Sequence, residues 1–185
     1  FTPIGFDFCF DGVTYQDCMV SSNGYLIFPG CYSEHGGNDV VPTGTSPWSI
    51  NAAAPNTNDA PRNAIMGPWQ DLNPSVAGTI RYQTLGTAPF RRLVVTYQTV
   101  AFFSCTGTFN TQQIILYETT NEIENHIETK LTCPGWVGGR AVQGVHNSTG
   151  TAAVTYPGRN NTVWTASNHA IRYTPLGDPE IEWYL

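Results

Sequence analysis

The sequence has few charged residues and no long hydrophobic run, and each absence narrows the possible functions. Charged residues make up only 12% of the chain, with eight Lys and Arg against fourteen Asp and Glu. A formal net charge of −6 without a basic patch argues against a nucleic-acid-binding surface. No apolar run approaches the roughly 20 residues of a membrane-spanning helix. The 185 residues are enough for one ordinary domain.

Helical periodicity is also missing. No stretch repeats hydrophobic residues at helical spacing for three turns, so no substantial helix is expected. The chain instead has 18 Gly and 13 Pro, which separate short apolar segments rich in β-branched and aromatic residues. This pattern predicts an all-β fold, an antiparallel and jelly-roll-like β-sandwich. The expected strands cover residues 6–10, 13–20, 25–28, 64–69, 79–83, 90–103, 112–118, 122–128, 141–147, 152–156 and 169–173.

Residues 90–128 are expected to form the centre of one sheet. They contain three consecutive strands joined by polar turns, which is typical of an antiparallel meander. The strand at residues 152–156 is expected at an edge, followed by a loop at 157–161.

The five cysteines indicate an oxidising, extracytoplasmic setting. None forms a C-x-x-C pair, which argues against a zinc site. Cys105 and Cys133 bracket two central strands and are the best candidate for a disulfide. Cys9–Cys18 is a second candidate across a small hairpin, and Cys18–Cys31 is its alternative. One cysteine is left over, most simply as a buried free thiol.

Residues 30–63 have no credible strand, and a segment of this length is either functional or a packed cover. As a ligand-facing surface, it would present Tyr32, His35 and Trp48. As a cover, it would seal one edge of the sandwich with Trp48 and Ile50. Both interpretations remain open.

Trp136 and Trp164 also fall in expected loops. Aromatic rings in loops stack on sugars or anchor protein contacts, and they also fill cores. Both residues are therefore candidates for ligand contact, with packing as the alternative.

Asp71 follows a predicted strand and is a candidate for a turn cap or for a Ca²⁺ site together with Asn73. An EF-hand loop beginning at Asp71 fails, because Val76 and Tyr82 occupy the positions that require Gly and Glu. Asp39 is a further candidate calcium ligand. No other cofactor is expected.

Glu122, Glu124 and Glu128 are the sharpest candidates for catalysis. They lie at alternate positions of one predicted strand, so they share one face. Paired carboxylates serve glycoside hydrolysis, and a jelly-roll carbohydrate-active enzyme is one alternative function. The ordinary explanation is a solvated outer face. The chain has no G-x-S-x-G motif and no H-x-H or H-E-x-x-H motif, so no catalytic residue is assigned.

Several stretches of the sequence together carry a resemblance, and they include Phe8–Gly12, Ser22–Phe28, Asn63–Leu72, Gly86–Arg91, Gln113–Glu124 and Ala141–Asn147. They resemble a β-sandwich module of large cell-surface proteins of Bacteroidetes, which are associated with gliding motility and type IX secretion. The resemblance covers roughly residues 4–176. More loosely, the chain resembles the nidogen-like extracellular domain through Asn23-Gly24, Trp69-Gln70-Asp71 and the strand Gly78–Tyr82.

The resemblance implies a secreted or surface-displayed, non-catalytic adhesion module that binds an extracellular glycan or a surface protein. It implies Ig-like or PKD-like neighbours in a multidomain chain, and it also implies the Cys105–Cys133 pair. Residues 1–176 are then the β-sandwich module, and residues 177–185 are a linker with the first strand of a truncated module. A structural spacer in a surface stalk is the other alternative.

Overall fold

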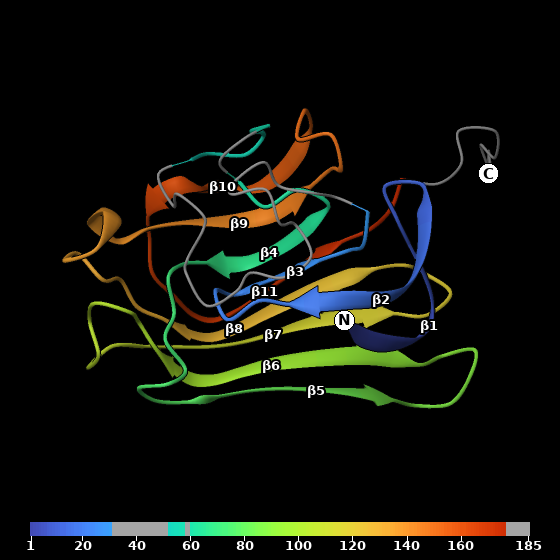
Figure 1. The fold of residues 1–185 in the computed structure, drawn as a ribbon, viewed down its shortest axis with the longest axis horizontal. Coiled ribbons are helices and arrows are strands. Elements are labelled where there is room, and N and C mark those ends of the chain that lie inside the picture. The colour runs from blue at the N-terminus through green and yellow to red at the C-terminus, as the bar shows by residue number, and fades with distance from the viewer. Residues whose placement is uncertain (31–51, 58–59, 177–185) are drawn as a thin grey trace.

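Two antiparallel sheets face each other across a shared interior (Figure 1). The computed structural model describes residues 1–30, 52–57 and 60–176, and these residues contain no α-helix. A 3₁₀ turn, η1 (Val137–Gly139), precedes β9. The six-stranded sheet contains, in spatial order, β1 (Thr2–Phe10), β2 (Val13–Val20), β3 (Tyr25–Ile27), β4 (Ala64–Trp69), β9 (Arg140–His146) and β10 (Ala153–Val163). The five-stranded sheet contains β11 (Ala166–Tyr173), β8 (Ile123–Lys130), β7 (Phe109–Tyr117), β6 (Arg92–Ala101) and β5 (Thr79–Leu85).

The predicted β-sandwich is confirmed. Strands β1 to β4 and strands β5 to β8 form two meanders, and the chain passes between the sheets after β4, β8 and β10. The likeness to a jelly roll is therefore limited to its two packed antiparallel sheets. The predicted central meander is also confirmed, because β6, β7 and β8 pair with one another in order.

One strand is longer than the sequence predicts. Residues 157–161 were expected to form a loop, but they lie inside β10, an edge strand of eleven residues. The β9–β10 register shifts between Thr155 and Asn160 and again before Thr162. Pro157 has no backbone N–H, and Gly158 has a φ of 76°. Both residues are compatible with a bulge on an edge strand. The Pro157-Gly158 pair, which suggested a loop in the sequence, therefore marks a bulge in β10.

One half of the interior is apolar. Alternate residues of β1, including Phe6 and Phe8, face inward and belong to one cluster with Leu93 and Val95 of β6. All four side chains are at most 5% exposed. Burial of such side chains contributes about 1.5–3 kcal/mol each. This cluster fixes β1 and β2 over β6 and β7.

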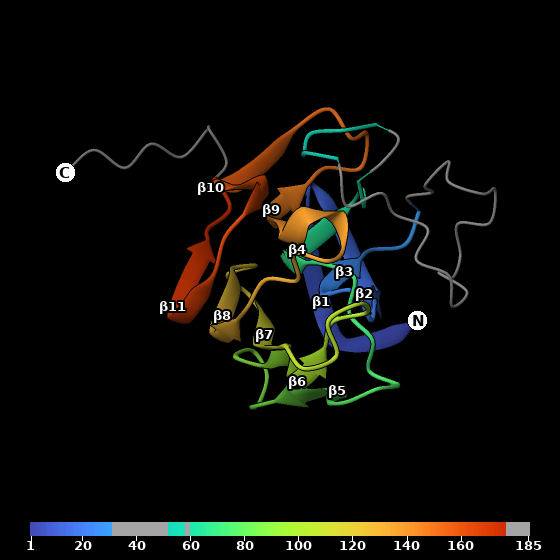
Figure 2. The same cartoon turned by 90° about the vertical axis from the view of Figure 1, so that its left-hand side faces the viewer.

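The other half of the interior is polar. Asn125 in β8 donates a hydrogen bond of 3.0 Å to the Gln112 side chain in β7 and accepts one from Gln143 in β9. Arg159 in β10 donates to the Gln143 carbonyl oxygen at 2.6 Å. Figure 2 shows β10 and β11 on this side of the sandwich. Side-chain hydrogen bonds therefore link the sheets here.

Part of the long segment after β3 covers the outer face of the six-stranded sheet. The ring of His146 accepts a hydrogen bond from the Asn56 N–H and bonds the carbonyl oxygen of Pro61 at 2.7 Å. The Asn160 side chain binds both the N–H and the carbonyl oxygen of Ala54. The buried cluster beneath includes Ala52, Ala54, Ala60, Tyr25, Met66, Trp69 and Val142.

Candidate functional site

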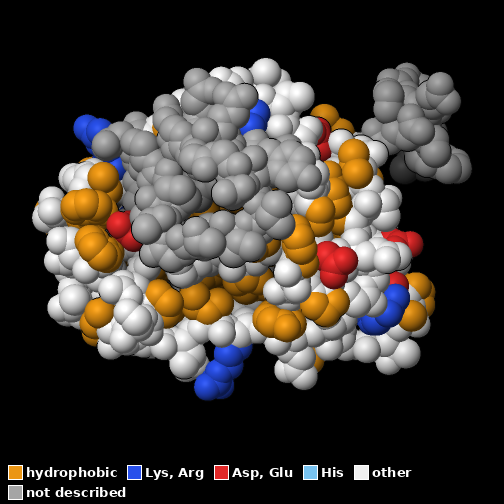
Figure 3. All heavy atoms as spheres, viewed as in Figure 1, with side chains coloured by type: hydrophobic (Ala, Val, Ile, Leu, Met, Phe, Trp, Pro, Cys, Tyr) orange, Lys and Arg blue, Asp and Glu red, His pale blue; other side chains and the backbone are white. Residues whose placement is uncertain are grey.

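Three loops meet at one end of the sandwich and expose two aromatic rings. Phe103 lies between β6 and β7, and Trp136 lies just before η1; their ring centroids are 5.4 Å apart. Phe103 is 50% exposed and Trp136 is 41% exposed. The Cys105–Cys133 disulfide joins the two loops, which confirms that predicted pair. We call Phe103 and Trp136 the aromatic pair; hydrophobic side chains gather at this end in Figure 3.

Asp71 supports the aromatic pair from the third loop. Its main-chain oxygen accepts a hydrogen bond of 3.0 Å from the Phe103 N–H. Burial raises the pKa of the Asp71 carboxyl, and a hydrogen bond from the Trp136 side chain opposes that rise. Asn73 caps its own turn, because its side-chain oxygen accepts a hydrogen bond from the Ser75 N–H at 3.1 Å. The sequence predicted a turn cap or a calcium ligand at Asp71 and did not predict its contact with Trp136.

Calcium binding by Asp71 and Asn73 stays a prediction. Within residues 1–30, 52–57 and 60–176, no group of three or more His, Cys, Asp or Glu is arranged to hold a metal ion. The third predicted ligand, Asp39, lies outside the described residues.

Removal of the disulfide should loosen this end. The Cys105→Ser/Cys133→Ser variant is expected to lose about 3–4 kcal/mol of unfolding free energy, because the bond closes a long loop in the unfolded chain. The two cysteines are separated by 28 residues. Urea denaturation measures the loss. Cys9→Ser is the matched control, because the Cys9 thiol is free. Equal stability of the double variant and the control would contradict a structural role of the bond.

The other candidates in the long segment lie outside the described residues. These are Tyr32, His35 and Trp48, together with Cys31. Their roles in ligand contact stay predictions.

Trp164 lies in the turn between β10 and β11 and is engaged by two cations. The Lys130 ammonium is 4.2 Å from the centre of its ring, and the Arg159 guanidinium is 4.4 Å away. Lys130 also donates a hydrogen bond to the Trp164 carbonyl oxygen. Trp164 therefore packs between charged side chains, as the packing alternative expects.

The predicted acidic face exists. Ile123 and Ile127 are buried, and Glu124 lies on the opposite face of β8. Burial alone would raise the pKa of Glu124, but hydrogen bonds from Arg172, His126 and Tyr117 lower it to about 2. A general acid needs a raised pKa. Glu124 is therefore not poised as a general acid, and it forms an ion pair with Arg172 at 2.6 Å.

The second predicted disulfide is wrong. Cys9 and Cys18 are free, and burial raises the pKa of the Cys18 thiol to about 12. The register explains the difference, because Cys9 pairs with Thr14 while Cys18 pairs with Thr2 at the far end of the hairpin. Cys18 is fully buried in the apolar core, where a neutral thiol packs like a small hydrophobic side chain.

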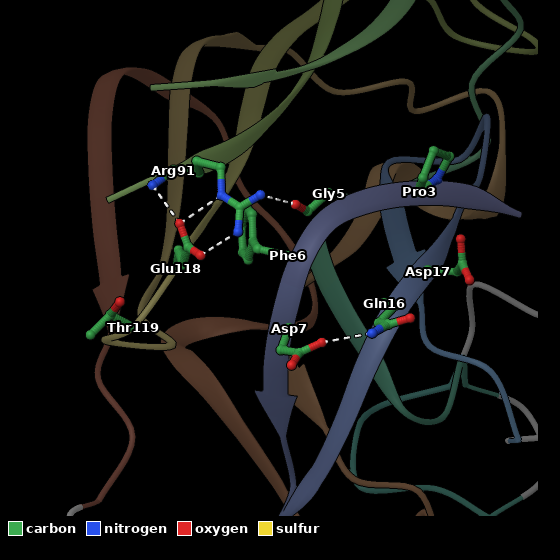
Figure 4. A pocket seen from close by; sticks show the side chains of 9 residues that line it. All are labelled: Pro3, Gly5, Phe6, Asp7, Gln16, Asp17, Arg91, Glu118 and Thr119. Carbon is green, nitrogen blue, oxygen red and sulfur yellow. Dashed lines mark hydrogen bonds and ion pairs between the residues drawn. The ribbon is translucent and has the colours of Figure 1, made fainter. Parts of the chain in front are cut away.

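An open cleft of about 690 Å³ lies between the β1–β2 hairpin and the ends of β6 and β7 (Figure 4). Arg91 forms its wall and bonds Glu118 through Nε at 2.8 Å and Nη2 at 2.5 Å. The same guanidinium donates to the Gly5 carbonyl oxygen of the other sheet. Asp7 and Asp17 line the facing side. We call this feature the Arg91 cleft.

Sequence reasoning missed the Arg91 cleft. Hydrogen bonds from Arg91 lower the pKa of Glu118 to about 2, so the pair stays charged. The residues are 27 positions apart and lie just outside their strands, where no periodicity indicates a shared site. The sequence did contain one indication of this ion pair. Paired antiparallel strands bring the start of one strand beside the end of the next, and Arg91 and Glu118 occupy such positions.

Comparisons with known proteins give one family. Residues 1–183 match the model of the family described as NIDO related. No curated protein and no solved structure matches the chain. No helix among the described residues is both long and apolar enough to cross a membrane. Because the match covers nearly the whole sequence, the chain belongs to the NIDO-related family.

Proposed function

We propose that the chain is an adhesion module of a larger surface-displayed or secreted protein, and that the aromatic pair contacts a surface protein. Membership of the NIDO-related family indicates an extracellular, non-catalytic type of module. The Cys105–Cys133 disulfide is consistent with that location. The observation that carries the proposal is the exposure of Phe103 and Trp136 on loops held by the disulfide.

The geometry of the rings favours protein as the ligand of the aromatic pair. Their planes are tilted by 55°, so they do not form one flat platform for a sugar ring. Exposed aromatic side chains on rigid supports are typical anchors of protein interfaces. Truncation of one such anchor costs about 2 kcal/mol or more of binding free energy, which corresponds to about a 30-fold loss of affinity. Loop residues on a rigid scaffold are also the usual place for binding.

The Phe103→Ala variant tests the proposal. Phe103 is half exposed, so its truncation should leave the fold intact and weaken attachment to intact cells about tenfold or more. Labelled protein and flow cytometry measure attachment before and after protease treatment of the cells. The matched control is Phe90→Ala, because Phe90 is 79% exposed at the opposite end of β6.

Equal attachment of Phe103→Ala and Phe90→Ala would contradict the proposed surface. Attachment that survives protease treatment and that Phe103→Ala still weakens would point to a glycan, instead of a protein, as the ligand of the aromatic pair. Complete absence of attachment would favour a structural spacer.

Further predictions about the neighbouring domains, a calcium requirement and the module boundaries accompany this proposal. We propose Ig-like or PKD-like neighbours, and a place among the surface proteins associated with gliding motility and type IX secretion, on the resemblance of stretches such as Ser22–Phe28. A calcium requirement is tested by repeating the cell-binding assay with Ca²⁺ and with a chelator. The module boundaries at residues 176 and 177 stay a prediction, because residues 177–185 lie outside the described residues.

A further inference from the structure

We propose that the Arg91 cleft binds an uncharged oligosaccharide. The site is separate from the aromatic pair, which lies at the other end of β6. Its volume of about 690 Å³ falls within the range of small-ligand sites, about 300–1,000 Å³.

The wall of the cleft offers hydrogen-bond donors. A guanidinium has five N–H groups. Arg91 uses one on Nε and one on Nη2 for Glu118, and one on Nη1 for the Gly5 carbonyl oxygen. One N–H therefore remains on each Nη atom. Because Glu118 and Gly5 hold the guanidinium from two sheets, these donors are fixed before a ligand arrives.

The facing side offers acceptors. Gln16 donates a hydrogen bond of 2.9 Å to one Asp7 oxygen, which leaves the second Asp7 oxygen and the Gln16 carbonyl oxygen for a ligand. The Asp17 carboxylate accepts no hydrogen bond from any other residue in the described part of the chain. Figure 4 shows Asp7, Gln16 and Asp17 on the β1–β2 side, across from Arg91 and Glu118.

This mixture of donors and acceptors selects a polyhydroxylated ligand. Each sugar hydroxyl donates one hydrogen bond and accepts others, so one ligand can use both sides of the cleft. A Lys or Arg side chain could pair with Asp7 or Asp17, but it has no acceptor for the remaining Arg91 donors, so it would use only one side of the cleft.

The charge of the cleft selects against acidic glycans. Arg91 and Glu118 neutralise each other, and Asp7 and Asp17 add two negative charges, so the lining of the cleft carries a net charge of −2. The chain as a whole also carries −6. Sialylated and sulfated oligosaccharides would meet like charge at short range.

A printed array of neutral, sialylated and sulfated oligosaccharides tests the inference with the intact chain. We expect binding to neutral oligosaccharides only. The best neutral probe is then titrated by calorimetry against Asp17→Asn, which should bind about tenfold or more weakly, because it loses a charged acceptor. Asp17 is exposed, so thermal unfolding should be unchanged.

Glu128→Gln is the matched control, because it makes the same change of charge at an exposed residue outside the cleft. The inference is overturned if no neutral oligosaccharide binds, or if Asp17→Asn and Glu128→Gln bind alike. Binding of hexalysine that Asp17→Asn weakens, without glycan binding, would also overturn it. Phe103→Ala should bind the oligosaccharide normally, so this inference and the proposed function fail separately.

Discussion

The Gly24→Ala variant is expected to lose about 3 kcal/mol or more of unfolding free energy, one of the largest losses for a single methyl group in this fold. Gly24 has a φ of +83°, which side chains rarely adopt. A Cβ at this position would also press against the main-chain oxygen of Pro68 and lie 2.9 Å from the Gln112 amide nitrogen. The Pro68 oxygen belongs to the main chain of β4, a central strand, so that contact cannot be relieved by a side-chain movement.

Gly12→Ala is the matched control for that loss. Gly12 has a similar φ of +76°, but no atom lies within 4 Å of a Cβ added there. It should therefore show the backbone cost alone, about 1–2 kcal/mol. Urea denaturation of both variants measures the difference. Equal losses would contradict the close packing of the Asn23-Gly24 turn against Pro68 and Gln112.

The second large effect is expected at Lys130, the only lysine of the chain, whose side chain is fully buried. Burial, together with the nearby Arg159, lowers its pKa from 10.5 to about 7. Below about pH 7 the folded protein holds this charge in its interior. Lys130→Met should then raise the unfolding free energy by about 1–4 kcal/mol at pH 6, since buried charges are often less stable than apolar replacements.

The advantage of Lys130→Met should shrink as the pH rises. Between pH 7 and 10.5 the unfolded chain binds the Lys130 proton and the folded chain does not, so the wild type gains stability with pH. Denaturation at pH 6 and pH 9.5 measures this trend. His169, whose pKa is lowered by burial and by Arg159, is present in both proteins, so most of its contribution cancels.

Arg140→Met removes an exposed cation and is the control for net charge. A pH-independent effect of Lys130→Met, or an equal effect of Arg140→Met, would show that Lys130 is not held as a buried amine.

The fold was largely predictable because local patterns and burial agree. Apolar residues alternate along β1 and β8, and the structure buries Phe6, Phe8, Ile123 and Ile127 on the inward faces of these strands. The Asn23-Gly24 turn was also visible, since Gly is needed where φ is positive.

Polar side chains in the interior were the main failure of sequence reasoning. Asn125 has the same parity as Ile123 and Ile127, so its inward position could be read from the strand. The hydrogen-bond partners of Asn125 could not be predicted from the sequence, because Gln112 and Gln143 come from two other strands. The Arg91 cleft was hidden for the same reason, since it joins residues from both sheets.

The most direct test of the central claim is attachment of the wild-type protein to intact cells, beside Phe103→Ala and Phe90→Ala. We predict saturable, protease-sensitive attachment that Phe103→Ala weakens about tenfold or more and Phe90→Ala leaves unchanged. Saturable attachment that both variants keep would contradict the role of the aromatic pair. No saturable attachment of the wild type would contradict the adhesion module itself.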